Sequence, residues 1–258
     1  MKIRWLAIFN TLSLALALVL NGLAVYLPLN GISTAEVSRK FANLFVPANY
    51  TFGIWSLIYL LLILFAIYQL KLAFGKKSAD QEVINKIGPW FVISSIFNAL
   101  WIVAWHNLRP GLALVLMAGI LLTLIAIYIN LRYDNAKYNR ATRWLVLVPI
   151  SVYLGWISVA TIANVAALLT SIRWSGWGLL PNLWAVIMLV VGLILAVAMI
   201  WKYSDYAYAL VIVWAYIGIF VARVQDASSL AYSVVVTSMM AVAAILVAIG
   251  LKVRENLK

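Results

Sequence analysis

Eight long apolar stretches constrain the fold of this chain more than any other feature of its sequence. They cover residues 5–29, 50–74, 89–107, 111–131, 144–170, 182–201, 206–221 and 229–251. A helix of about 20 apolar residues crosses the hydrocarbon core of a bilayer, where every backbone polar group must find its partner within the chain. The runs are continuous, unlike the short alternating strands of a membrane barrel. The sequence therefore predicts an all-α, polytopic membrane helix bundle with about eight transmembrane helices.

The sixth and seventh stretches are separated only by Lys202-Tyr203-Ser204-Asp205, which we interpret as a tight turn between two helices. The alternative is a seven-span chain in which two of the stretches fuse. The first stretch is too long for a cleaved signal peptide, so we expect it to be retained.

The basic residues give an independent prediction of orientation. Lys and Arg number 19 against 7 Asp and Glu, for a net charge of +12. With eight spans, fourteen basic residues lie on the side of the two termini, and the other side holds only Arg39, Lys40, Arg109, Arg173 and Arg223. Because cytoplasmic loops are enriched in Lys and Arg, we expect both termini in the cytoplasm and the protein in the cytoplasmic (inner) membrane. The charges are too dispersed for a nucleic-acid surface, and no nucleic-acid partner is expected.

The composition excludes several kinds of chemistry. The chain has no Cys and one His, which excludes disulfides, thiolate ligands and multi-histidine metal sites. No carboxylate lies in the middle of a span, where a proton relay would need one. His106 could ligate a haem iron, and the alternative is a polar residue at the membrane interface. Nothing in the residues argues for catalysis, so we expect neither catalytic residues nor a metal site.

Three stretches carry polar and aromatic residues at helical spacing, which places each set on one helix face. An Asn inside a span should point into the bundle, where it either joins two helices or contacts a ligand. Trp residues at mid-depth lie too deep for the interfacial belt and suit a cavity for a flat apolar ligand. The candidate site residues are Trp55 and Tyr59 in the second stretch, Asn98 and Trp101 in the third, and Trp156, Ala160 and Asn164 in the fifth.

Other Trp residues fit the interfacial belt instead. The members of this group lie near span ends and are Trp5, Trp90, Trp144, Trp174, Trp177 and Trp201.

Four motifs, in this order, resemble the tryptophan-rich sensory protein / translocator protein family (TspO/MBR). Pro47 precedes Phe52-Gly53-Ile54-Trp55 and Tyr59, and Asn98 precedes Trp101. Residues 109–114 read Arg-Pro-Gly-Leu-Ala-Leu, and Pro149 precedes the set formed by Trp156, Ala160, Thr161 and Asn164. The resemblance covers about residues 5–169. Family members usually end after five spans, so the three further spans indicate an extended subgroup, with a five-helix core over residues 1–170 and three added helices over 171–258.

The resemblance implies a five-helix bundle with a pocket near the outer helix ends, under the loop between the first two spans. Family members bind tetrapyrroles, sterols and synthetic aromatic ligands, and Trp55 and Trp156 match the two ligand-facing tryptophans. The implied function is binding of a flat hydrophobic ligand with a sensory or regulatory role. A transporter of such a ligand and a porphyrin-degrading membrane enzyme are the alternatives. The cofactor is unknown, and a porphyrin or haem is a candidate for the ligand itself.

Small residues recur on one face of two of the added spans, which favours close helix contact. We expect these helices to pack on the five-helix core or on a second copy of the chain, which leaves a homodimer open. The small residues are Ala185, Gly192 and Ala196 in the sixth stretch and Ser233, Thr237, Ala241, Ala244 and Ala248 in the eighth.

Overall fold

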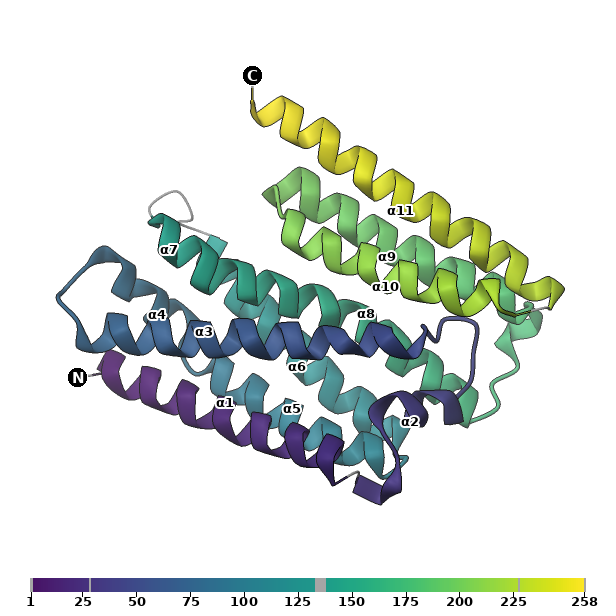
Figure 1. Ribbon diagram of the computed structural model, residues 1–258, viewed down its shortest axis with the longest axis horizontal. Coiled ribbons are helices and arrows are strands. Elements are labelled where there is room, and N and C mark those ends of the chain that lie inside the picture. Colours follow the sequence, from purple (N-terminus) through teal and green to yellow (C-terminus); the bar gives the residue numbers. More distant parts are fainter. Residues whose placement is uncertain (1, 28, 133–137, 227, 258) are drawn as a thin grey trace. The chain divides into compact units, whose positions relative to one another are not determined.

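The computed structural model describes residues 2–27, 29–132, 138–226 and 228–257, and within these ranges it holds helices and no strands (Figure 1). The long helices are α1 (Lys2–Tyr26), α3 (Ile54–Phe74), α5 (Trp90–His106), α6 (Pro110–Arg132), α8 (Val148–Ser171), α9 (Pro181–Tyr203), α10 (Tyr206–Val224) and α11 (Ser229–Asn256). Shorter helices are α2 (Thr34–Lys40), α4 (Glu82–Ile87) and α7 (Arg140–Thr142).

Seven helices of the described part are long and apolar enough to cross a membrane, or up to eight if α4 and α5 form one span bent by 45°. The prediction of an all-α polytopic bundle with about eight spans is therefore confirmed. Each of the eight apolar stretches forms its own helix, so the alternative in which two stretches fuse is wrong.

The turn between α9 and α10 shows why those two helices stay separate. Ser204 adopts a left-handed conformation (φ 51°), which ends α9. The side chain of Asp205 then accepts a hydrogen bond from the backbone N–H of Tyr208 at 3.1 Å, which caps the start of α10. An N-cap carboxylate satisfies one of the backbone donors that a helix start leaves open.

The chain divides into two compact units, Met1–Thr34 with Ile54–Ile157 and Ala35–Gly53 with Ser158–Lys258. The division falls inside α8. The predicted domains, residues 1–170 and 171–258, stay a prediction, because they follow the family motifs rather than the contacts within the chain.

The first unit packs α1 against α3 and α5, and α5 against α6. Small and aliphatic side chains such as Ala7, Leu14 and Ala17 are buried along α1, whereas Leu12 and Leu16 are exposed. An exposed apolar face is expected for a helix that meets lipid. On α6, a Cβ atom on Gly119 would lie 2.7 Å from the ring of Phe97, so these two helices approach closely at the glycine.

A widened turn precedes α8. Residues Arg143–Leu147 form one π-helical turn between α7 and α8. This turn ends two residues before Pro149, which has no N–H to donate. With this turn, residues Arg140–Ser171 form one candidate span of 32 residues.

In the second unit, α9, α10 and α11 pack against one another in pairs. The predicted small face of α9 is confirmed as buried, and a Cβ atom on Gly192 would collide with the hydroxyl of Tyr216 on α10. On α11 the prediction is only partly correct. Ala241 and Ala248 are buried, but Ala244 is exposed and Ile245 is fully buried instead.

Candidate ligand site

Four aromatic side chains of the first unit gather around the ring of Trp55. Its ring centroid lies 5.3 Å from Tyr59, 5.9 Å from Trp101, 6.1 Å from Tyr153 and 6.2 Å from Trp156. The Tyr59 ring stacks on Trp55 at 25°, whereas Trp156 meets it edge-on at 83°. These are the separations and orientations that aromatic pairs prefer. We call Trp55, Tyr59, Trp101, Tyr153 and Trp156 the aromatic cluster.

The aromatic cluster is closed on one side and open on the other. Trp101 and Trp156 are each only 3% exposed. Trp55 and Tyr59 lie one turn apart on α3 and are half-buried. The accessible surface of the cluster is therefore formed by the side chains of α3.

Asn98 lies beside the aromatic cluster and joins three helices. It is buried on α5, accepts a hydrogen bond from Nδ2 of Asn21 on α1 at 2.8 Å, and donates one to the hydroxyl of Tyr153 on α8 at 3.2 Å. The expectation that Asn98 points into the bundle is confirmed, and the geometry is that of a helix–helix contact. The nearby Tyr59 hydroxyl is buried and has no hydrogen-bond partner among the described residues.

Two of the seven predicted residues fall outside the aromatic cluster. Ala160 and Asn164 lie one and two turns beyond Trp156 on α8, in the second unit. The side chain of Asn164 donates a hydrogen bond to the carbonyl of Ala160 at 2.8 Å. The five predicted residues of the first unit, Trp55, Tyr59, Asn98, Trp101 and Trp156, come together around Trp55.

Sequence reasoning missed two members of this region, although each carried a signal. Tyr153 lies three residues before Trp156, which places both on one face of α8. Asn21 lies within the first apolar stretch. A polar amide side chain inside a span is unexpected there, as it is for Asn98 in the third stretch.

His106 is fully buried rather than at an exposed interface. Its Nε2 lies 3.1 Å from the hydroxyl of Thr34, and its carbonyl accepts a hydrogen bond from Asn30 at 3.2 Å. The neighbouring Trp105 indole donates to the carbonyl of Thr34 at 3.3 Å. The C-terminal end of α5 thus holds the segment between α1 and α2 in place through these hydrogen bonds. Within the described ranges, no group of three or more His, Cys, Asp or Glu residues could hold a metal ion.

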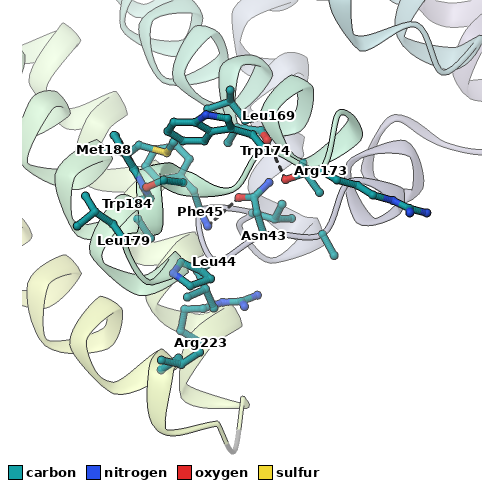
Figure 2. A pocket seen from close by; sticks show the side chains of 18 of the residues that line it. Asn43, Leu44, Phe45, Leu169, Arg173, Trp174, Leu179, Trp184, Met188 and Arg223 are labelled. Atoms are coloured by element: carbon teal, nitrogen blue, oxygen red, sulfur yellow. Dashed lines mark hydrogen bonds between the residues drawn. The ribbon is translucent and has the colours of Figure 1, made fainter.

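The second unit holds a cavity of about 750 Å³. Its walls come from residues 39–46, the end of α8, residues 173–181, the first half of α9 and residues near the α10–α11 turn (Figure 2). None of the seven predicted residues lines it. Two of the tryptophans that the sequence predicts for the interfacial belt, Trp174 and Trp177, form a group with Trp184, with centroids 4.9 to 5.7 Å apart.

The helices and the aromatic cluster define a multi-pass integral membrane protein with an aromatic-lined region in its first unit. A family model described as TSPO-like protein matches residues 7–251. The chain therefore belongs to the TspO/MBR family, and α9, α10 and most of α11 lie within the matched region. Neither the search of curated proteins nor the search of solved structures gave a significant match.

Proposed function

We propose that the aromatic cluster binds a flat, hydrophobic ligand of the tetrapyrrole or sterol-like class, and that binding has a sensory or regulatory role. One observation carries this proposal. Trp55 contacts the rings of Tyr59, Trp101, Tyr153 and Trp156 and yet stays half-buried. A flat ligand would cover the remaining face of a ring that its neighbours already hold in place.

The energetics support a ligand at this position. Each aromatic pair is worth about 0.5–1.5 kcal/mol beyond the area it buries, and a fixed wall of rings loses little entropy when a ligand stacks on it. The Tyr59 hydroxyl, buried without a partner among the described residues, could donate to an oxygen of the ligand. A buried polar group without a partner costs about 1–3 kcal/mol, so such a bond would favour binding.

Fluorescence titration with protoporphyrin tests the proposal. The double variant Trp55→Ala/Trp156→Ala should weaken binding at least tenfold, or about 1.4 kcal/mol. A matched control is Trp90→Ala/Trp201→Ala, which removes two exposed tryptophans outside the cluster and should bind like wild type. Equal affinity of wild type and the Trp55/Trp156 variant would show that the ligand site lies elsewhere.

Two further experiments with the purified protein distinguish ligand binding from the two alternative functions. Movement of protoporphyrin into sealed proteoliposomes would favour a transporter. Light-dependent bleaching of bound protoporphyrin would favour a porphyrin-degrading enzyme. Binding without either result is what the proposed sensory role requires.

A further inference from the structure

The cavity of the second unit is large enough for a ligand of its own. Its volume of about 750 Å³ falls within the range of about 300–1,000 Å³ that is usual for small-molecule sites. It is lined by residues of the second unit alone.

Charge is concentrated around this cavity in an unusual way. Arg39, Arg173 and Arg223 line it, and no Lys, Asp or Glu does. These are three of the five basic residues that the sequence places on the side opposite the termini. Since basic residues are depleted on the outer side of membrane proteins, three arginines around one cavity point to a negatively charged occupant.

The acidic neighbours of these arginines leave one positive charge in excess. Arg39 pairs with Glu36 at 3.7 Å, and Arg223 pairs with Asp226 at 3.2 Å. Hydrogen bonds from Ser228 to the Asp226 carboxylate hold the pKa of that carboxyl below its usual range, so the acid is ionised at neutral pH. Arg173 makes no ion pair with another described residue. Three cations against two anions suit an occupant with a single negative charge.

Arg223 is the best placed of the three to hold that charge. Its side chain is only 17% exposed, and its Nε is buried without a hydrogen-bond partner among the described residues. A guanidinium has five donor hydrogens, so donors remain after the contact with Asp226. Figure 2 shows Arg173 and Arg223 on different sides of the cavity, so Arg173 acts at a distance as a positive charge that attracts the ligand.

Most of the remaining wall is apolar, and its aromatic side chains are held by local contacts. The ring centroids of Trp174 and Trp184 lie 4.9 Å apart, and the Trp184 indole donates to the carbonyl of Gly176 at 2.9 Å. Phe45 is 2% exposed, and its backbone N–H donates to the side chain of Asn43 at 2.9 Å. Aromatic and aliphatic side chains with a few convergent polar groups are the usual lining of a small-molecule site.

We propose that this cavity binds an amphipathic anion. The apolar body lies against Trp174 and Trp184, and one oxyanion head, a carboxylate or a phosphate ester, is held by Arg223. The site is distinct from the aromatic cluster and needs none of its residues.

Quenching of tryptophan fluorescence by dibromostearate tests the site, because bromine on the chain quenches indoles that it touches. The full-length protein is titrated in neutral detergent at alkaline pH, where the fatty acid is ionised, with the methyl ester as the neutral probe. We expect Arg223→Gln to weaken dibromostearate binding at least tenfold and to leave binding of the ester unchanged. Arg109→Gln, an exposed arginine outside the cavity, is the matched control and should behave like wild type.

Two further variants test whether a loss of binding in Arg223→Gln reflects the lost contact or a misfolded protein. Arg223→Lys retains the charge and should recover part of the affinity. Trp174→Phe/Trp184→Phe should retain binding, measured by displacement, but lose part of the quenching. Equal affinity of Arg223→Gln and wild type, equal affinity for acid and ester, or undiminished quenching in the tryptophan variant would each overturn the proposal.

Competition with dodecyl phosphate identifies the head group. Displacement of dibromostearate assigns the site to phosphate esters as well as carboxylates, and failure to displace it assigns the site to carboxylates. Binding of the neutral dimethyl ester of protoporphyrin to the aromatic cluster should be unaffected by Arg223→Gln, so each of the two proposals can be overturned without the other.

Discussion

Among single residues, Asn98 carries the clearest structural role. It connects α1, α5 and α8 through Asn21 and Tyr153, and Asn98→Ala would leave both partners with a lost hydrogen bond in the bundle interior. A double-mutant cycle of Asn21→Ala and Asn98→Ala, measured by unfolding in mild detergent, should give a coupling energy of about 0.6–1.7 kcal/mol. Purely additive effects would show that the bond contributes nothing to stability.

The sequence predicted that Asn98 faces inward but could not predict its partners. Asn21 lies 77 residues earlier in the chain, and whether the two amides meet depends on the rotation of α1 about its axis. That rotation is set by packing, and α1 has only a weak difference between its faces. Trp55 and Trp156 were predicted more fully, because helical spacing and the family motifs both pointed to them.

Among the elements, the contact between α9 and α10 depends on a missing side chain. A methyl group on Gly192 would collide with the Tyr216 hydroxyl, which donates to the carbonyl of Leu189 at 2.6 Å. We expect Gly192→Ala to destabilise the protein by about 1–3 kcal/mol, the usual cost of overpacking. Adding Tyr216→Phe removes the obstructing oxygen and should recover part of the loss in thermal unfolding. Equal stability of Gly192→Ala and wild type would contradict this packing.

The turn between α9 and α10 gives a second prediction at this scale. Asp205→Ala removes the hydrogen bond to the Tyr208 N–H and should cost about 1 kcal/mol, the typical value of an N-cap. Asp205→Asn retains an acceptor and should cost less. If both variants unfold at the wild-type temperature, the cap does not stabilise α10.

The helix faces were predicted less well than the helices themselves. Length and hydropathy define a span, but lipid tails are as apolar as Leu, so periodicity hardly separates the lipid-facing side from the packed side. On α11 the prediction therefore placed Ala244 on the packed face, whereas the residue buried there is Ile245. On α9 the small residues gave the correct face because close approach requires them.

For the whole molecule, the division of basic residues predicts where the ends of the chain lie. With eight spans, fourteen of the 19 fall on the side of the termini, so a reporter fused after Lys258 should be cytoplasmic. A reporter inserted after Gly178, in the segment between α8 and α9, should be on the opposite side. An external C-terminus would require an odd number of spans, and α5, with 17 residues, would then be the helix that does not cross.

The number and length of the helices followed from the sequence, but the cavity of the second unit did not. Its walls combine residues 39–46 with residues 166–188 and 223–230. Loops bring these helix ends together, and the course of the loops depends on left-handed residues such as Arg173 and Trp177, which propensity disfavours. The arginines were visible in the sequence, but only their grouping around one cavity gives them a function.

Because of the π-helical turn at Arg143–Leu147, a deletion before Pro149 should disturb the structure less than a deletion after it. A π turn accommodates one more residue than an α turn, so loss of one residue there would leave an ordinary α-helix and the same face of α8 toward Trp55. Loss of one residue between Pro149 and Trp156 would instead rotate Trp156 by about 100° out of the aromatic cluster. Among homologous chains, length differences in this helix should therefore collect before the proline.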